Sequence, residues 1–546
     1  MKTAFLLFAG LAAATALAGP VRFSGSASIF AEQNFVAGES APGPNSNFGF
    51  RLNPMLSVFG LPLGLDVLVS SQESNLRQSL DKFRIYLKPK ELLRQMVNAP
   101  GFLFSIRGIE IGSCSPNYSN LVLSGVPVLG ASVELQPWLL YLAGTGGRSQ
   151  RAIEGSDSTQ PVYSRMIYAA KLGLGRKEGN HGYFTLMHAA DVVSSLRRNY
   201  ELDTVFGSDT IVDTTELVRP KENFVLGFEY TLSLFDDRFR IESEICGSEL
   251  TRDVRAPELE IKAAPKWATN ILRPRLTSAF DYSYAVKPML DVLGTKLYGS
   301  LKMVGPGYQS LGSPSLRNDV FGFSAGLSRS FASDAVTAAA SWTGEHDNLI
   351  GMKLQTTRFD SYSASLGLHF DRVPSLDLGY APYTERSDSS NRRTDMVTAS
   401  TGYSFKAGTV SNTPGVSVSW QKLNSSDETE NYVATDLMLS HGLGFESPLS
   451  VSASLGWSRT AYAADSAETA VSAGVAPAYT FFGKWSNSLS LDGTFGRSET
   501  RYDFRLSSSV PLGRIADASA GVDYGIYRGE RPYTDLRLSA QLNKSW

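Results

Sequence analysis

The chain has 546 residues, of which 42% are hydrophobic and 19% are charged, and its formal net charge at pH 7 is -2. A net charge this close to zero gives no basis for a nucleic-acid partner. Beyond residue 19 the sequence has no run of 18 apolar residues, which excludes a bundle of membrane-spanning helices.

The N-terminus has the pattern of a secretory signal peptide. Met1 and Lys2 give a short positive start, residues 3–15 form an apolar run, and Ala16-Leu17-Ala18 matches an A-x-A cleavage site. We therefore expect residues 1–18 to be removed. No linker-like, low-complexity or highly charged stretch divides the remainder, so residues 19–546 are expected to form a single domain without a preceding plug.

Strand-like segments then recur to the C-terminus, with two interruptions. Residues 90–96 predict a short helix or a turn that rests on a membrane interface. Residues 115–126 lack alternation and predict either an outer loop or a segment folded inward as a constriction. In the second case the candidate constriction residues are Ser115, Asn117, Tyr118 and Asn120.

The number of strands is constrained by parity, because single-chain barrels of this kind have an even number of antiparallel strands. A direct count of strand-like segments gives about 25. The missing strand fits residues 127–152, where Val128–Leu135 and a strand from Leu139 flank a turn. We therefore predict about 26 strands, with 24 as the alternative if region 47–71 holds one hairpin fewer.

The second half of the chain alternates most clearly. Residues 361–370, 449–458 and 501–510 place apolar side chains at every second position, with serine, glycine or charged residues between them. Each such strand has one face for hydrocarbon and one for water. Short connections near 236–237, 332–333, 372–373, 446–447, 483–484 and 513–514 separate longer ones near 196–221, 251–272, 306–316, 385–392, 424–431 and 461–468. Short periplasmic turns and longer extracellular loops are typical of outer-membrane barrels.

The polar face of these strands carries charges of both signs. They are Arg501, Asp503, Arg505, Asp517, Asp523, Asp535 and Arg537 in the last three strands, and Arg240, Glu242 and Glu244 further back. We expect these side chains to line the lumen. They could act as a charged filter for solutes or as cross-strand ion pairs that hold the wall. Their mixed signs predict no preference for cations or anions.

No pattern predicts catalysis, a metal or a cofactor. Residues 322–326 match G-x-S-x-G around Ser324, but they lie within a strand pattern with no helix after it. A nucleophilic serine of this motif requires a sharp strand-to-helix turn. The five histidines show no metal-ligand spacing. Cys114 and Cys246 could be free or form one disulfide, and the sequence leaves both possibilities open.

The last segment completes the pattern. Leu536, Leu538, Leu542 and Trp546 share one face of residues 534–546. With its signal peptide, its alternating strands and this terminal aromatic residue, the chain resembles the porin-like class of outer-membrane β-barrels. The resemblance covers the whole mature chain. It implies an integral location in the outer membrane of a Gram-negative envelope, contact with its lipid, and insertion by the barrel-assembly machinery. Trp546 would then end a closing strand that pairs with the first strand.

A narrower resemblance concerns residues 76–83 and 113–135. They look like a recurrent pattern in large uncharacterised outer-membrane barrels, a group that carries no established activity to transfer.

The sequence thus predicts an all-β, closed antiparallel transmembrane barrel that is not an enzyme. Its expected function is a passive channel or translocation pore for solutes or polymers. The alternative is a structural scaffold or surface receptor that uses the long loops 196–221 and 251–272. A remote alternative is an outer-membrane lipid hydrolase with Ser324 beside His346 or His369.

Overall fold

The computed structural model describes residues 21–38, 46–58, 61–71, 81–87, 105–154, 160–196, 205–206, 209–210, 218–259, 272–464, 467–513 and 515–546. The expected signal peptide, the short helix at 90–96, and large parts of the loops 196–221 and 251–272 lie outside these residues. The rest is almost entirely β-structure.

The strands are β1 (Val21–Gly38), β2 (Ser46–Val58), β3 (Leu61–Ser70), β4 (Lys82–Leu87), β5 (Ile106–Cys114), β6 (Val128–Leu135), β7 (Leu140–Gln150), β8 (Ser164–Gly175), β9 (His181–Val192), β10 (Val205–Phe206), β11 (Asp209–Thr210), β12 (Glu222–Leu234), β13 (Phe239–Thr251), β14 (Ser278–Val292), β15 (Thr295–Val304), β16 (Val320–Phe331), β17 (Val336–Asp347), β18 (Arg358–Leu368), β19 (Ser375–Tyr380), β20 (Tyr383–Arg386), β21 (Asn391–Gly402), β22 (Phe405–Ala407), β23 (Val410–Ser425), β24 (Tyr432–Gly444), β25 (Leu449–Tyr462), β26 (Glu468–Phe481), β27 (Trp485–Gly496), β28 (Thr500–Pro511), β29 (Asp517–Arg528) and β30 (Tyr533–Ser545). Within the described residues, the single-turn 3₁₀ helices Val193–Ser195 and Glu428–Glu430 lie in connections.

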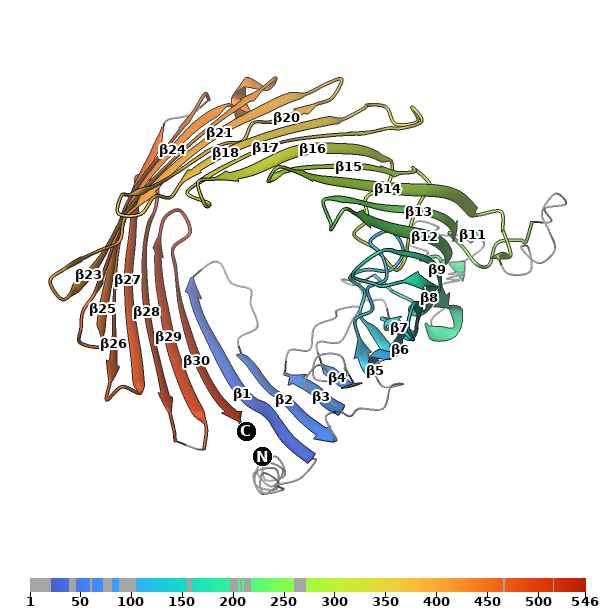
Figure 1. Cartoon of the computed structure of the whole chain (residues 1–546), viewed down its shortest axis with the longest axis horizontal. Coiled ribbons are helices and arrows are strands. Elements are labelled where there is room, and N and C mark those ends of the chain that lie inside the picture. The colour runs from blue at the N-terminus through green and yellow to red at the C-terminus, as the bar shows by residue number, and fades with distance from the viewer. Residues whose placement is uncertain are drawn as a thin grey trace.

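The strands form a closed antiparallel ring (Figure 1). In the described part of the chain 28 strands share one sheet, and β10 and β11 form a separate small one. Strands β19 and β20 follow one another between β18 and β21, and β22 continues β21 beside β23. Each of these pairs fills one place, so the ring has 26 positions. Pro382 lies between β19 and β20, where its missing N–H interrupts the ladder.

The predicted count of 26 is confirmed, and the alternative of 24 is wrong. Region 47–71 forms a full hairpin, β2 with β3, and the strand inferred within 127–152 is present as β6 followed by β7. The closing pair is also confirmed, because β30 pairs with β1 from Ser26↔Ser545 to Gly38↔Tyr533. Trp546 stacks on Phe23 at the end of the β1–β30 pair, with ring centroids 5.7 Å apart.

The two rims of the ring differ as expected. One end, the turn rim, carries tight connections such as Leu293-Gly294, where φ values of 53° and 77° at both residues fit a two-residue hairpin turn. The other end, the loop rim, carries the longer connections, including 305–319 and 426–431. It also carries residues 348–357 between β17 and β18, a connection that the sequence analysis missed.

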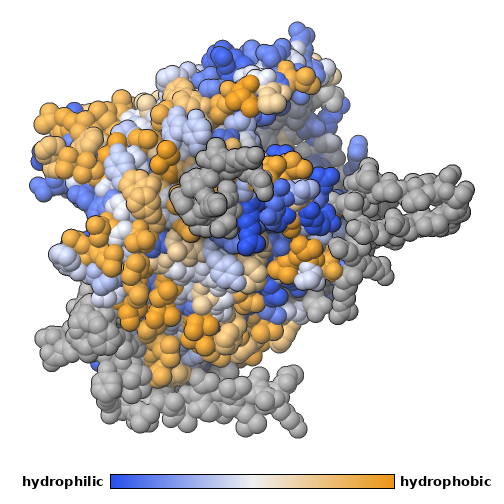
Figure 2. Space-filling model, turned by 90° about the vertical axis from the view of Figure 1, so that its right-hand side faces the viewer, coloured by the Kyte–Doolittle hydropathy of each residue, from blue (hydrophilic) through white to orange (hydrophobic). Residues whose placement is uncertain are grey.

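The outer face of the ring is apolar. Along β8 the side chains of Tyr168, Leu172 and Leu174 are each more than half exposed, while the alternate residues Ile167 and Ala169 are buried. Figure 2 shows apolar residues spread over this side of the molecule. Among the described residues, no helix is both long and apolar enough to cross a membrane.

Candidate functional site in the barrel lumen

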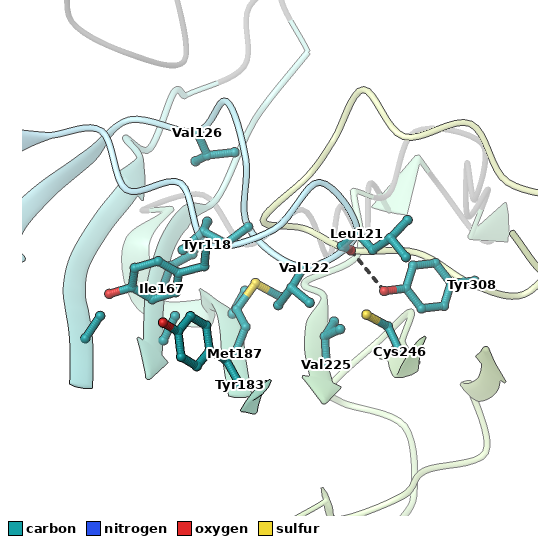
Figure 3. Close-up of a cluster of buried hydrophobic side chains, with 14 of the residues drawn as sticks. Tyr118, Leu121, Val122, Val126, Ile167, Tyr183, Met187, Val225, Cys246 and Tyr308 are labelled. Atoms are coloured by element: carbon teal, nitrogen blue, oxygen red, sulfur yellow. Dashed lines mark hydrogen bonds between the residues drawn. The ribbon is translucent and has the colours of Figure 1, made fainter. Parts of the chain in front are cut away.

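The largest departure from a plain barrel is a segment folded against the inner wall, residues 115–127, called here the inner segment. It follows β5, and its side chains Leu121, Val122 and Leu123 are at most 2% exposed. They belong to a buried apolar cluster with residues of β7, β8, β9, β12 and β13 (Figure 3). Of the two alternatives that the sequence left open, the structure therefore has the inward-folded one.

The wall beneath the inner segment is built from small residues that leave room for it. Ala143 on β7, Ala169 on β8 and Gly227 on β12 all point inward beneath it. A Cβ atom added at Gly227 would lie 2.9 Å from a methyl carbon of Val122 and 2.9 Å from the sulfur of Cys246. Contacts of that length are repulsive, so glycine at this position is what allows Val122 to reach the wall.

A second connection, residues 305–319, also folds inward and is called here the second inner loop. The Tyr308 hydroxyl donates to the carbonyl oxygen of Leu121 (2.9 Å), and Ser310 Oγ donates to that of Val122 (2.5 Å). Ser313 Oγ donates to the carbonyl of Asn120 (2.8 Å). The sequence predicted a longer connection near 306–316, and the structure has it between β15 and β16, folded inward. Its hydroxyls satisfy carbonyls that the buried inner segment cannot pair internally.

Charged side chains of the wall hold the polar backbone of the inner segment. Lys171 on β8, only 5% exposed, pairs with Glu229 on β12 and donates from Nζ to the carbonyl oxygen of Tyr118 at 2.6 Å. Ser119 contacts the carboxylate of Glu244 on β13. Burial raises the pKa of the Tyr118 phenol, which therefore stays neutral at physiological pH.

The four predicted constriction residues do not act alike. Tyr118 is buried against the wall, whereas the side chains of Ser115, Asn117 and Asn120 are exposed. The inner segment thus presents an apolar side to the wall and a polar edge away from it. It narrows the lumen from the side of β7 to β13, and the side chains that it exposes to the lumen are polar.

The second inner loop is tethered to the neighbouring connection at the loop rim. Asp319, 6% exposed, accepts from the backbone N–H of Leu349 (2.8 Å), and Lys353 Nζ lies 2.6 Å from Asp319 and 3.0 Å from Asp347. Burial alone would raise the pKa of Asp319. The hydrogen bonds from Lys353 and from the backbone outweigh burial, and the net effect lowers that pKa. Asp319 is therefore charged throughout the neutral range.

The predicted charges of the last three strands form ion pairs along the inner face. Arg501 binds Asp503 through two contacts of 2.7 and 3.0 Å, and Arg505 Nε lies 2.6 Å from Asp523. The side chains of these two arginines are 56% and 71% exposed. Water therefore reaches this part of the wall, in contrast to the covered wall beneath the inner segment.

The remaining predicted charges lie apart from that group. Arg537 on β30 pairs with Glu32 on β1 (3.2 Å), Asp535 lies across β29 from Asp503, and Asp517 begins β29. Arg240 and Glu242 pair with each other on β13 at 2.8 Å, and Glu244 contacts the inner segment. Since β13 and β28 lie on opposite sides of the ring (Figure 1), the structure does not bring the two sets together.

Strand pairing assigns every wall residue to a face, because directly paired residues point to the same side. From β16 to β30 the inner-facing acids are Glu345, Asp347, Asp377, Glu385, Asp436, Glu468, Asp492, Asp503, Asp517, Asp523 and Asp535. The inner-facing bases there are Arg392, Lys406, Arg501, Arg505 and Arg537. All fifteen strands of this stretch lie within the described residues, so this half of the wall carries eleven acids and five bases.

The other half of the wall is balanced. In the described strands β1–β9 and β12–β15 the inner-facing acids are Glu32, Asp66, Glu110, Glu134, Asp191, Glu229, Glu242, Glu244, Asp281 and Asp291. The bases are Arg22, Arg51, Lys82, Arg84, Arg165, Lys171, Arg240, Lys287, Lys296 and Lys302. Arg107, at a bulge in β5, adds an eleventh base and contacts Glu134 at 2.8 Å.

Other candidate groups are accounted for by structure. Cys114 and Cys246 are both buried and free, so they form no disulfide. Ser324 lies in the middle of β16, where its hydroxyl shares a hydrogen bond of 2.8 Å with Ser300. In the part of the chain that is described, no group of three His, Cys, Asp or Glu side chains is placed to hold a metal ion.

Sequence reasoning missed Lys171, Glu229 and the second inner loop. A signal was present on β8, where the inward-facing Lys171 lies between the small inward-facing residues Ala169 and Gly173. Small side chains around one inward charge indicate that something other than water fills the space. Which segment fills it cannot be read from the strand itself.

The apolar outer face, the closed ring and the polar inner face define the architecture. The fold is that of the porin-like transmembrane β-barrel class. No known protein family and no curated protein matches the sequence.

Several solved structures are similar in fold. One is a chain of the E. coli P pilus tip assembly intermediate PapC-PapD-PapK-PapG, with 12% identity over 95% of this chain and 60% of that one, and a TM-score of 0.45. Another is the P pilus usher PapC translocation pore, with 13% identity over 95% and 98% of the two chains and a TM-score of 0.28. The outer membrane protein OpdK from Pseudomonas aeruginosa shares 10% identity over 60% and 94%, with a TM-score of 0.31. Similarities this low say nothing of what this chain carries or binds.

Proposed function

We propose that this chain is an integral outer-membrane channel through which hydrated solutes or polymers pass by diffusion. The observation that carries the proposal is the water-accessible polar wall inside a ring of 26 strands. With strands about 4.8 Å apart and tilted by about 40°, a circular ring of this size measures about 50 Å between backbones. Side chains cannot fill such a width, so water occupies what the inner segment and the second inner loop leave free.

The apolar outer face supports a position in a lipid bilayer. Exposed leucine, phenylalanine and tyrosine side chains on β8, β9 and β12 would be costly in water and suit hydrocarbon. In this orientation the turn rim lies in the periplasm and the loop rim faces outward. Contact with outer-membrane lipid and insertion by the barrel-assembly machinery are part of this proposal.

The mechanism is passive. Polar and charged side chains of the wall replace part of the hydration of a passing solute, and the narrowest cross-section sets the size limit. The inner segment reduces that cross-section from one side, through Asn117 and Asn120 at its polar edge. No covalent step is involved, and we propose that the chain is not an enzyme.

The test is conductance of the purified protein in a planar bilayer. We expect discrete channels, and we expect deletion of residues 115–126 to increase the single-channel conductance because it removes an obstacle from the lumen. The control shortens the connection at 426–431, which lies on the far side of the ring (Figure 1) and should leave conductance unchanged. A membrane that stays sealed with both the full chain and the deletion would refute the channel.

The alternative functions have less support. A scaffold or receptor would rely on the loops 196–221 and 251–272, much of which lie outside the described residues. A stoichiometric membrane partner without conductance would favour it. A hydrolase would need a base near Ser324, but the directly paired residue on β17 is Thr343, and His369 contacts Asp377 at 3.3 Å. The hydrolase would be supported only if the purified protein had lipase activity and lost it on changing Ser324→Ala.

A further inference from the structure

The charges of the lumen are unevenly distributed between its two halves. The wall from β16 to β30 has eleven inward acids against five bases, whereas the remaining wall strands have ten acids against eleven bases. We infer that the channel prefers cations over anions. This inference rests on the channel function proposed above and names the class of solute that it favours.

Ion pairing sharpens the asymmetry. On the acid-rich wall Arg501, Arg505 and Arg537 are each occupied by one carboxylate, at 2.7, 2.6 and 3.2 Å. Among the described residues, Asp436 and Asp492 are hydrogen-bonded only to neutral serine hydroxyls, and Asp535 has no basic side chain within 4.0 Å. These bases, together with Arg317 and Lys353 from the loops, which pair with Glu345 and Asp347, neutralise part of the acidic wall and leave carboxylates over.

Two of these carboxylates, Asp492 and Asp535, form a row across neighbouring strands with Asp503, the partner of Arg501. Asp492 on β27 is directly paired with Asp503 on β28, which is paired with Gly525 on β29, which is paired with Asp535 on β30. A Cβ atom added at Gly525 would touch the Asp535 carboxylate and lie 3.5 Å from that of Asp503. Like charges directly opposite one another destabilise a sheet. Mobile cations in the lumen would offset this repulsion.

The balanced wall does not counter the acidic one. Two of its bases are engaged deep in the wall: Lys171 pairs with Glu229 beneath the inner segment, and Arg165 binds Asp191 at 2.7 and 3.1 Å. The side chains of Lys171 and Arg165 are at most 16% exposed. Each pair takes one acid and one base out of the open lumen, so this wall stays balanced and the excess of acids on the opposite wall remains.

The width of the barrel limits the size of the effect. Fixed charges act over a Debye length, about 8 Å at 0.15 M salt and about 30 Å at 0.01 M. Across a lumen tens of ångströms wide, the walls therefore control the ion content only in dilute salt. We expect a K⁺ over Cl⁻ permeability ratio of about five near 0.01 M KCl, falling toward one at 1 M.

The experiment measures reversal potentials of the full-length protein in planar bilayers across KCl gradients. The variant Asp436→Asn, Asp492→Asn, Asp535→Asn removes three uncompensated inner-facing carboxylates by near-isosteric changes. Its permeability ratio in dilute salt should fall at least about twofold. The matched control removes three exposed carboxylates at the turn rim, through Asp334→Asn, Asp371→Asn and Glu446→Gln, and should keep the native ratio.

The outcomes separate the two proposals. Conductance with a permeability ratio at or below one in dilute salt overturns the cation preference and leaves the channel standing. A triple variant with the native ratio, or a control that falls as far, also overturns it, because the wall carboxylates would not then be the cause. No conductance from the native protein overturns the channel and the preference together.

Discussion

The seating of the inner segment can be tested by one buried charge. Val122 is 0% exposed and lies against Gly227 and Cys246, whereas the side chain of Asn120, two residues earlier, is exposed. We predict that Val122→Asp releases the inner segment from the wall. Asn120→Asp adds the same charge to the same segment at an exposed position and serves as the matched control.

The expected magnitude follows from burial. The side chains of Leu121, Val122, Leu123 and Val126 each contribute about 1.5–3 kcal/mol to docking, or roughly 6–12 kcal/mol in all as an upper estimate. Val122→Asp removes about 2 kcal/mol of this and adds about 3 kcal/mol or more for an uncompensated buried carboxylate. A total near 5 kcal/mol shifts the docking equilibrium by roughly three to four orders of magnitude.

The assay uses Cys246, which is free, 2% exposed and lies beside Tyr308, whose hydroxyl bonds Leu121 of the inner segment (Figure 3). Both proteins carry Cys114→Ser, so that Cys246 is the thiol that reacts. A water-soluble maleimide should label Cys246 slowly in the protein with Val122 and about 10³ times faster with Val122→Asp, since the labelling rate follows the fraction of molecules in which the inner segment is undocked. Asn120→Asp should label at the native rate. Rapid labelling of the native protein, or equal rates for the two aspartate variants, would refute this account of the docking.

Two further predictions concern the polar tethers. Lys171→Met leaves Glu229 without its main partner and should destabilise the barrel by about 3 kcal/mol. The double variant with Glu229→Gln should recover part of this loss in urea unfolding, and a single variant as stable as the native protein would contradict the role of the pair. The lowered pKa of Asp319 means that its contribution is complete above the ordinary carboxyl value of about 3.9 and is lost as the pH falls through the lower folded value. The amide hydrogen exchange rate of residues 348–357, corrected for intrinsic rates, should therefore stay low from about pH 7 to pH 4 and increase only below that. An increase already above about pH 5 would exclude Asp319 as the tether.

Much of the fold was predictable because it repeats. Alternation along residues 449–458 or 501–510 is local, so the sequence of each strand alone shows which residues lie on its apolar face and which on its polar face. The number of strands came from parity and from one turn at 136–138, and the structure has that turn between β6 and β7. The connection at 348–357 was missed although it contains Asn348 and Gly351, both with positive φ, because apolar residues such as Leu349, Ile350 and Leu354 surround them.

The candidate site was predictable only in part. Residues 115–126 stood out because they break the alternation, yet an apolar run such as Leu121-Val122-Leu123 fits an outer loop as well as an inner one. Its place depends on Gly227 and Lys171, which are more than forty residues away in the sequence and meet it only through the curvature of the ring.

The sequence by itself determined the ring, its two faces and its closing strand, since these follow from a period of two repeated along the chain. Only the tertiary structure decided which connections fold inward, because that requires complementary shapes on distant strands, as between Val122 and Gly227. The tertiary structure also decided the charge of the lumen. Single strands show mixed signs, and the excess of acids on one wall appears only when pairing places all the strands side by side.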